Sequence, residues 1–230
     1  MIRVLLALLP GAWAETPLTT EQVVAAMMEA DQSRAALLRG YTSVRVYSME
    51  NKRFGARAAM TVRLTYRHPG QKQFELVEES GSATVRKKVF RRMLDTEMEA
   101  SSDQMRAATQ ITANNYQFRL VGSDHVDGRR AYVLEAVPRT KSKFLFHGKV
   151  WVDAEDFAVA RIEGSPAQKP SIWVRKTSFV HRYQKVGPFW LALANRSDTD
   201  VVVFGHTQVR IEYSGYQINR QQPESGLTDR

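Results

Sequence analysis

The sequence contains no cysteine, and this absence excludes disulfide bonds, thiol nucleophiles and cysteine-based metal sites. It also leaves no cysteine that could carry an N-terminal lipid, so we expect the protein not to be a lipoprotein itself. Three motifs of catalytic sites are missing as well: the P-loop, the G-x-G-x-x-G dinucleotide pattern and the G-x-S-x-G nucleophile elbow. No catalytic residue is therefore nominated, and an enzyme such as a hydrolase is the least favoured of the functions considered.

Long apolar runs are also missing, because no segment approaches the roughly 18 apolar residues that indicate a membrane span. The N-terminus instead has Arg3, a short apolar run over residues 4–9, and Ala12-Trp13-Ala14. A positive start, an apolar centre and an A-x-A site are typical of a secretory signal peptide. We predict that residues 1–14 are such a peptide, that residues 15–220 form one domain, and that the polar tail 221–230 is disordered.

Acidic residues are outnumbered by basic ones, with 24 Asp plus Glu against 33 Lys plus Arg and a net charge of +9. Removal of Arg3 with the signal peptide leaves 32 basic residues against 24 acidic ones, a net charge of +8. In an exported protein, such a charge favours contact with an anionic membrane surface. Nucleic acid, the usual partner of a basic cytoplasmic protein, is disfavoured for the same reason.

Three segments have the features of helices. Thr19 and Gln22 form a capping-box pattern before an apolar periodicity that ends at Gly40, which predicts a helix over about residues 20–38. Apolar residues also recur at helical spacing over residues 87–100, between several basic ones. This basic cluster either contacts lipid headgroups or forms an ordinary solvated face. A weaker helical pattern follows over residues 103–111.

In the rest of the chain, apolar and polar residues alternate with the period of two that is typical of half-buried strands. In the first strand Val44 and Val46 alternate with Arg45 and Tyr47, which assigns one apolar face and one wet face. Turns are predicted at His68-Pro69-Gly70 and at Asp127-Gly128. The predicted strands cover residues 41–47, 60–66, 74–79, 115–120, 131–137, 144–152, 157–163, 171–183, 189–195, 199–204 and 207–218.

So many strands cannot form a flat open sheet, because sheets of about ten strands curl or close. No linker rich in Pro, Gly or Ser divides the chain. The sequence therefore predicts a mainly β (α+β) fold, with a single strongly curved antiparallel sheet of about ten strands covered by a few helices.

Polar clusters that could support chemistry are few. The five histidines are isolated in the sequence, which disfavours a metal site; they are His68, His125, His147, His181 and His206. Ser123-Asp124-His125 contains the residue types of a catalytic triad, but adjacent residues cannot hydrogen-bond in series, so we interpret it as a surface turn. The acidic stretch 153–156 lacks the glycine and distal glutamate of a calcium loop, and an Asp that hydrogen-bonds its own turn is the better interpretation.

Aromatic residues are the remaining candidates. Trp151, Trp173 and Trp190 lie on separate late strands, with several phenylalanines nearby. They form either an ordinary core or the lining of an apolar ligand cavity within the curved sheet.

Two segments resemble the late hairpins of the periplasmic lipoprotein-sorting superfamily, which includes LolA, LolB and the sensor RseB. They are GKVWVDAEDFAVARIEG, residues 148–164, and SIWVRKTSFVHRYQKVGPFWLALANRSDTDVVVFGHTQVRIEYSGYQI, residues 171–218. The shared features are an aromatic-x-Asp strand end at Trp151-Val152-Asp153, the strand start Phe189-Trp190, and the closing run over residues 207–218. The order of elements also agrees over about residues 18–220.

This resemblance implies a half-open antiparallel barrel closed by helices, whose interior receives the acyl chains of lipids or lipoproteins. The absence of cysteine fits a soluble periplasmic carrier like LolA better than the lipid-anchored LolB. On this basis the predicted lid helix includes Leu94 and Met98. The residues predicted to face the cavity are Met60, Val62, Leu64, Phe74, Phe146, Trp151, Trp173 and Trp190.

The implied function is the shielding of acyl chains during outer-membrane lipoprotein or lipid sorting, without a metal or other cofactor. The expected partners are lipoprotein or lipid acyl chains, an anionic membrane surface and a membrane-associated donor or receptor protein. The alternative is an RseB-like envelope sensor that acts through a protein partner.

Overall fold

The computed structural model describes residues 17–99, 103–169, 173–203 and 205–219. The predicted signal peptide and the predicted polar tail lie outside these residues. Helix α1 (Thr20–Leu37) precedes strands β1 (Gly40–Asn51), β2 (Ala56–Arg67) and β3 (Gln71–Gly81). A helical segment follows, made of α2 (Ala83–Val85), the π-helical turn η1 (Arg86–Phe90), α3 (Arg91–Glu99) and α4 (Asp103–Thr109). Seven further strands complete the chain: β4 (Tyr116–Val126), β5 (Arg129–Pro138), β6 (Phe146–Asp153), β7 (Val159–Pro166), β8 (Val174–Val186), β9 (Phe189–Val201) and β10 (Gly205–Asn219).

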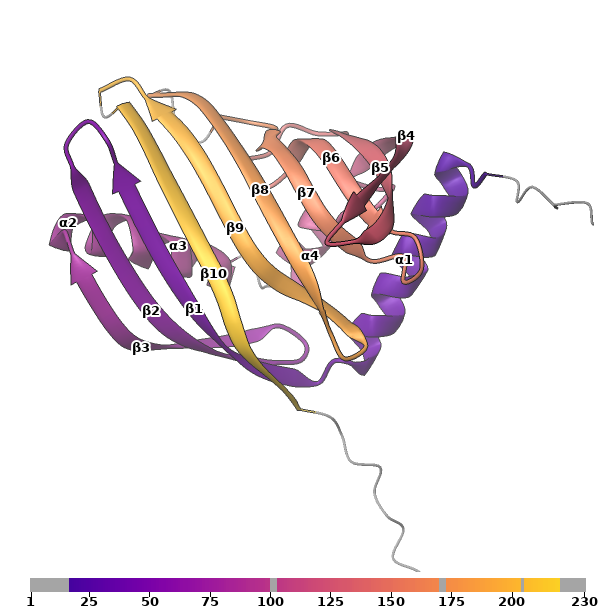
Figure 1. Ribbon diagram of the computed structural model, residues 1–230, viewed down its shortest axis with the longest axis horizontal. Coiled ribbons are helices and arrows are strands. Elements are labelled where there is room, and N and C mark those ends of the chain that lie inside the picture. Colours follow the sequence, from indigo (N-terminus) through magenta and orange to yellow (C-terminus); the bar gives the residue numbers. More distant parts are fainter. Residues whose placement is uncertain (1–16, 100–102, 170–172, 204, 220–230) are drawn as a thin grey trace, which may run out of the picture.

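The ten strands form one antiparallel sheet in the order β3-β2-β1-β10-β9-β8-β7-β6-β5-β4. The predicted architecture is therefore confirmed, and the sheet is curved but not closed, since β3 and β4 are its two edges. All neighbours are consecutive in the chain except β1 and β10, which pair as the third and fourth strands of the sheet. Because β3 and β4 are joined by the helical segment, that segment must cross the open side (Figure 1).

Local predictions agree with the structure at several points. Thr19 and Gln22 form the capping box at the start of α1. The β4–β5 turn has positive φ at both Asp127 (50°) and Gly128 (82°), as a tight hairpin turn requires. The helix predicted over residues 87–100 begins earlier, because its first turns are α2 and η1.

Three local predictions are wrong. Residues 199–201 are the end of β9, so no separate strand covers residues 199–203. Ser123-Asp124-His125 lies within β4 and not in a turn, because the extended pairing with β5 continues to Val126. In β1 the predicted faces are inverted: Arg45 and Tyr47 are buried, at 4% and 1% exposure, while Val44 and Val46 are half-buried.

The face of the sheet that the helices cover is here called the inner face, and it carries two apolar clusters. The first joins Val23, Val24 and Met27 of α1 to residues of β4–β7, including Tyr116 and Val150. The second joins Val85 and Phe90 of the helical segment to Tyr47, Met60 and Val62. Burial of these large apolar side chains is the main force that holds the helices against the sheet.

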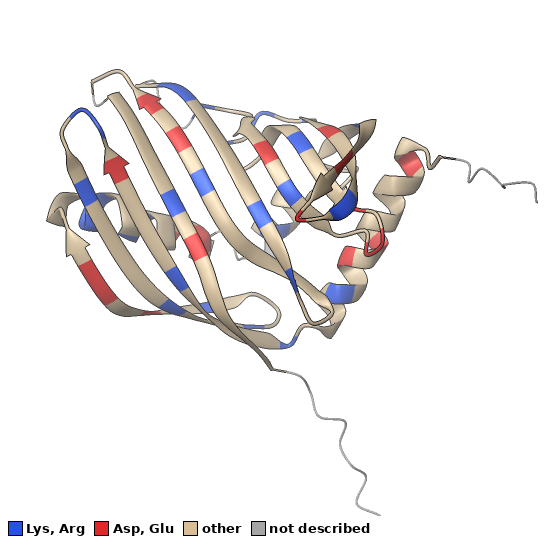
Figure 2. Cartoon of the chain, viewed as in Figure 1, with Lys and Arg blue, Asp and Glu red and all other residues tan. Residues whose placement is uncertain are grey.

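The opposite, outer face carries many exposed charges, which Figure 2 shows as alternating stripes along the strands. Cross-strand pairs include Arg63 with Glu75 at 3.2 Å and Arg119 with Glu135 at 2.7 Å. Such exposed pairs each contribute little to stability, but their charges keep the outer face polar and hydrated. No helix among the described residues is both long and apolar enough to cross a membrane.

We predict that Thr19→Ala lowers the free energy of unfolding by about 1 kcal/mol, because the Thr19 hydroxyl accepts a hydrogen bond from the Gln22 amide at the start of α1. Urea unfolding followed by circular dichroism measures this. The control is Ser33→Ala, an exposed site on the same helix, for which we expect a change within about 0.5 kcal/mol. Equal losses in both variants would contradict a capping role.

Candidate functional site

A large cavity lies between α1 and the inner face of the sheet and has a volume of about 1210 Å³. Apolar residues of α1 line one side, among them Val24, Met27 and Met28. The opposite side is lined by Tyr116 and Phe118 of β4, by Tyr183 of β8, and by Phe189, Trp190 and Leu191 of β9. Charged residues also line the cavity, including Glu21, Asp31, Arg34 and Arg139. The cavity thus combines an apolar lining with several charged groups, as sites for amphiphilic ligands require.

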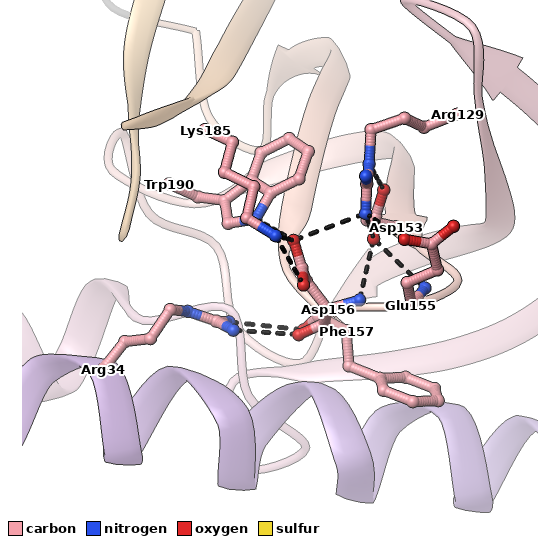
Figure 3. Close-up of polar contacts among 8 residues, drawn as sticks. All are labelled: Arg34, Arg129, Asp153, Glu155, Asp156, Phe157, Lys185 and Trp190. Atoms are coloured by element: carbon pink, nitrogen blue, oxygen red, sulfur yellow. Dashed lines mark hydrogen bonds and ion pairs between the residues drawn. The ribbon is translucent and has the colours of Figure 1, made fainter. Parts of the chain in front are cut away.

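Helix α1 is fixed over this cavity near both of its ends. Near its N-terminus, the Thr20 hydroxyl accepts a hydrogen bond from the Leu120 amide at 3.0 Å. Near its C-terminus, the Arg34 guanidinium donates to the carbonyl oxygens of Asp156 and Phe157, at 2.8 and 3.4 Å (Figure 3). The position of α1, and with it the shape of the cavity, therefore depends on the β6–β7 turn that contains Asp156 and Phe157.

That turn is organised by Asp153, whose side chain is 1% exposed. Its carboxylate accepts hydrogen bonds from the Arg129 guanidinium at 2.6 and 2.8 Å and from the amides of Glu155 and Asp156 at 3.1 and 2.7 Å (Figure 3). The predicted Asp that hydrogen-bonds its own turn is therefore confirmed. Burial alone would raise the pKa of Asp153, but these donors outweigh it and hold the pKa below its ordinary value.

Asp156 connects the same turn to the β8–β9 hairpin. Its carboxylate accepts hydrogen bonds from Lys185 at 3.0 Å and from the Trp190 indole at 2.9 Å (Figure 3). Because Trp190 and Arg34 both line the cavity, this polar network forms part of its rim.

A second, smaller cavity of about 170 Å³ lies beneath the helical segment. It is lined by Met60 and Val62 of β2, Phe74 of β3 and Leu94 of α3. Four of the residues predicted for the ligand cavity and its lid are thus brought together, at the opposite part of the sheet from α1.

Between the two apolar regions, the inner face carries a partly buried ionic cluster. The Arg45 guanidinium contacts both carboxylate oxygens of Glu97 on α3, at 2.8 and 2.7 Å, and Lys72 of β3 donates to the same carboxylate at 2.8 Å. The guanidinium carbon of Arg45 also lies 5.0 Å from the centre of the Tyr213 ring and 5.5 Å from that of Phe74. Burial would lower the pKa of Arg45, but Glu97 outweighs it and raises the pKa, so the charge persists.

The polar residues around this cluster are uncharged at neutral pH. Burial raises the pKa of Tyr183 to about 12, and it also raises the pKa values of Tyr213 and Tyr216. Burial lowers the pKa of His181 to about 4. These groups therefore offer hydroxyls and a neutral imidazole to the interior. Three buried polar atoms on β1 have no hydrogen-bond partner within the described part of the chain: Ser43 Oγ, Arg45 Nε and the Tyr47 hydroxyl.

The remaining predicted cavity residues are dispersed. Phe146 is buried in the cluster under α1, where its ring centre lies 5.1 Å from that of Tyr116. Leu64 is fully buried on β2. Trp190 lines the large cavity directly. Whether any of these side chains contacts an acyl chain stays a prediction.

Three predicted positions do not face either cavity. Trp151 lies on the opposite side of β6 from Val150, because side chains alternate along a strand, and its indole donates to Asp124 at 3.0 Å. Trp173 is 58% exposed in the turn before β8, and Met98 is 47% exposed on α3. An aromatic pattern alone cannot distinguish these positions from cavity-lining ones, because it does not reveal the face of the sheet.

Met27 and Met28 line the large cavity but were not among the predicted cavity residues, since residues 20–38 were predicted only as a helix. Arg45, which lies in the ionic cluster, was assigned to the solvent-exposed face but is buried. One signal was available, since the aromatic residues Tyr41 and Tyr47 share the parity of Arg45 in β1. No group of three or more His, Asp or Glu residues that could hold a metal ion occurs among residues 17–99, 103–169, 173–203 and 205–219.

We predict that Asp153→Ala lowers the free energy of unfolding by about 2–4 kcal/mol, because it removes the two shortest hydrogen bonds of Arg129, which keeps only Glu155 and Asp156, and the acceptor of two turn amides. Glu155→Ala is the matched control in the same turn; its side chain is 78% exposed, so we expect a change within about 0.5 kcal/mol. Both values come from urea unfolding at neutral pH. Similar values for the two variants would refute the organising role of Asp153.

A pH-dependent stabilisation is predicted for Glu97. Burial alone would raise the pKa of Glu97, but Arg45 and Lys72 outweigh it and hold the pKa below its ordinary value. The ion pair therefore stabilises the fold fully above the unfolded-state pKa of about 4.3, and this stabilisation is lost as the pH falls through the folded-state pKa. We expect Glu97→Gln to cost about 2–3 kcal/mol near pH 7 and progressively less below about pH 4.3.

Urea unfolding across this pH range measures the Glu97 effect. The control is Glu78→Gln on the exposed part of β3, which should change stability by less than about 0.5 kcal/mol at either end of the range. A loss in Glu97→Gln that is independent of pH would show that packing of α3, and not the charge, is responsible.

Comparison with known proteins gives similarity only at the level of structure. No model of a known protein family matches the chain, and no curated protein sequence does. A DUF1329 family protein from Desulfovibrio piger has a TM-score of 0.52 at 14% identity, over 90% of this chain and 96% of that one. A putative outer membrane lipoprotein-sorting protein domain from Vibrio parahaemolyticus has a TM-score of 0.43 at 13% identity, over 86% of this chain and 94% of that one. A LolA superfamily protein from Nitrosomonas europaea has a TM-score of 0.45 at 10% identity, over 93% and 99%.

At such low identities a similarity concerns architecture and carries no residue roles. The curved, helix-covered antiparallel sheet of this chain is the fold that it shares with the DUF1329 family protein from Desulfovibrio piger.

Proposed function

We propose that the protein is a periplasmic carrier or binding protein that shields the acyl chains of lipids or lipoproteins. The observation that carries this proposal is the cavity of about 1210 Å³ between α1 and the inner face. Ligand pockets are commonly about 300–1,000 Å³, so this one is large enough for an extended or folded acyl chain. Its lining of methionine, valine, leucine and aromatic side chains suits a ligand without a fixed shape.

The energetics of transfer support reversible binding. Each methylene group that leaves water for an apolar site gains roughly 0.8 kcal/mol, so about ten buried methylenes gain roughly 8 kcal/mol before the costs of ordering. A membrane offers the same chain a similar gain. Transfer between membranes therefore needs a cavity that competes with the bilayer but does not hold the chain irreversibly.

Two parts of the structure could regulate entry and release. Helix α1 lies over the large cavity through its polar contacts at Thr20 and Arg34. Helix α3 is tied to the sheet by Glu97, and its Leu94 covers the smaller cavity. Movement of either helix would widen the interior, and a donor or receptor protein at a membrane is the partner that we expect to promote it.

The proposal assigns no catalytic residue, metal or other cofactor to the protein. Export to the periplasm is supported by the signal-peptide pattern of residues 1–14 and by the resemblance to the lipoprotein-sorting superfamily. The basic net charge supports contact with anionic membranes during loading or release.

The first experiment is native mass spectrometry of the mature chain purified from a periplasm without detergent, followed by lipid analysis of an organic extract. We expect a stoichiometric lipid adduct, or binding of an added fluorescent fatty acid. Met28→Arg should weaken fatty-acid binding by about tenfold or more, because it places a charge in the apolar lining at a half-buried position.

Leu37→Arg is the matched control, because Leu37 is 66% exposed on the same helix and does not line the cavity. It should bind the fatty acid as the unchanged protein does. If the purified chain carries no lipid and binds neither added fatty acid nor added lipoprotein, the carrier function is refuted and a protein-binding envelope sensor is favoured.

A further inference from the structure

We propose that one end of the sheet is a membrane-docking surface that inserts aromatic and aliphatic side chains into the interface of an anionic bilayer. We call this surface the apolar tip and define it as residues 52–55, 173–176 and 202–203. It comprises the β1–β2 turn, the β9–β10 turn and the start of β8. The proposal rests on the proposed function and deepens it, because it names the surface through which a carrier would approach a membrane.

Hydrogen bonds hold the three parts of the tip side by side. Arg53 of the β1–β2 turn donates to the Val203 carbonyl at 3.0 Å, which links this turn to the β9–β10 turn. The Val202 amide donates to the Trp173 carbonyl at 2.9 Å, which links the β9–β10 turn to the residue before β8. All three lie at one end of the strands (Figure 1). They therefore form one continuous surface from segments far apart in the sequence.

The tip exposes an unusual amount of apolar surface. Phe54 and Trp173 are each 58% exposed, Val203 is 54% exposed and Val202 is 40% exposed. Single exposed apolar residues are ordinary, but a cluster that includes a tryptophan and a phenylalanine indicates an interaction surface. Tryptophan in particular favours the membrane–water interface, where its ring is buried and its N–H remains hydrated.

The charges of the tip complement an anionic membrane. Its ten residues include Lys52, Arg53, Arg175 and Lys176 and no Asp or Glu, and all four cations are exposed. The carboxylates that flank the tip already have partners: Glu50 contacts Arg57 at 3.1 Å, and Asp200 contacts His206 at 2.9 Å. Figure 2 shows basic residues on the β1–β2 turn and at the start of β8.

This combination favours a bilayer over a protein partner. Phe54, Trp173, Val202 and Val203 lie in turns, and no tip residue lines either of the two cavities described above. Apolar residues surrounded by lysine and arginine are instead typical of surfaces that bury a few side chains at the depth of the headgroups while the cations contact anionic lipids.

Vesicle flotation with the mature chain tests this directly. We expect attachment to phosphatidylcholine vesicles that contain about 30% phosphatidylglycerol and weak attachment to phosphatidylcholine alone. Phe54→Ser combined with Trp173→Ser should reduce attachment by about tenfold or more. Lys52→Gln combined with Lys176→Gln should remove most of the preference for the anionic vesicles, and about 0.5 M salt should do the same.

Leu37→Ser is the matched control. Leu37 is 66% exposed, more than any other large apolar residue in the described part of the chain, and it ends α1 just before β1, far from the tip at the other end of that strand. Its vesicle attachment should be unchanged. Equal attachment of the Phe54/Trp173 variant and the unchanged protein, or no attachment by the unchanged protein, would overturn the docking surface.

Binding of a fluorescent fatty acid without vesicles separates this proposal from the proposed function. The tip variants should bind the fatty acid normally, because none of the tip residues lines the large cavity. If the unchanged protein attaches to vesicles but does not bind the fatty acid, the proposed carrier function is refuted and the proposed docking surface is retained.

Discussion

The pairing of β1 with β10 is the constraint on which the rest of the structure depends. It joins the first strand of the chain to the last one in the interior of the sheet, so two meanders become a single ten-stranded sheet. As a result, the consecutive strands β3 and β4 become the two edges. Their connection has to cross the open side, and because the residues that cross include apolar ones such as Val85 and Phe90, they cover the inner face. The topology therefore produces a half-open barrel with a helical cover, with no need for the strands themselves to close.

The inner face is divided into two apolar regions by a polar band, and both regions depend on a polar contact to a helix. Under α1, the apolar packing is oriented by Arg34 and the Asp153-organised turn. Under the helical segment, Arg45 and Lys72 fix the position of Glu97 on α3. Apolar burial supplies most of the stabilisation but has no direction, whereas hydrogen bonds and ion pairs have one. Packing thus determines that the helices cover the sheet, and the hydrogen bonds of Arg34 and the ion pairs of Glu97 determine where.

Much of this architecture could be predicted from the sequence, because it depends on periodicity. The period of two predicted nearly all the strands, and the Thr19–Gln22 pattern predicted the start of α1. Which face of each strand is buried was harder to predict, because a polar residue is expected on the exposed face, whereas an arginine with a carboxylate partner can be buried. Arg45 is buried because Glu97, 52 residues away, neutralises it, and no local pattern reveals a partner at that distance. For the same reason Trp151 was assigned to the cavity, although its indole pairs with Asp124 on the opposite face. The candidate site is formed by contacts across the sheet, which explains why its members were only partly found.

The polar band also limits what the interior can hold. Tyr213 and Asn195 are joined by a hydrogen bond of 2.8 Å across β9 and β10, beside the Arg45 cation and in line with the neutral His181 and Tyr183. A saturated chain that crossed this band would lie against charged and hydroxyl groups and would gain little from leaving water. An acyl chain is therefore better accommodated within the region under α1, where the volume is greatest. The ester or headgroup of the same molecule would be placed toward the band, where Ser43 Oγ, Arg45 Nε and the Tyr47 hydroxyl can donate hydrogen bonds. The division of the inner face would thus orient an amphiphile bound as we propose, with its chain under α1 and its polar end toward the polar band.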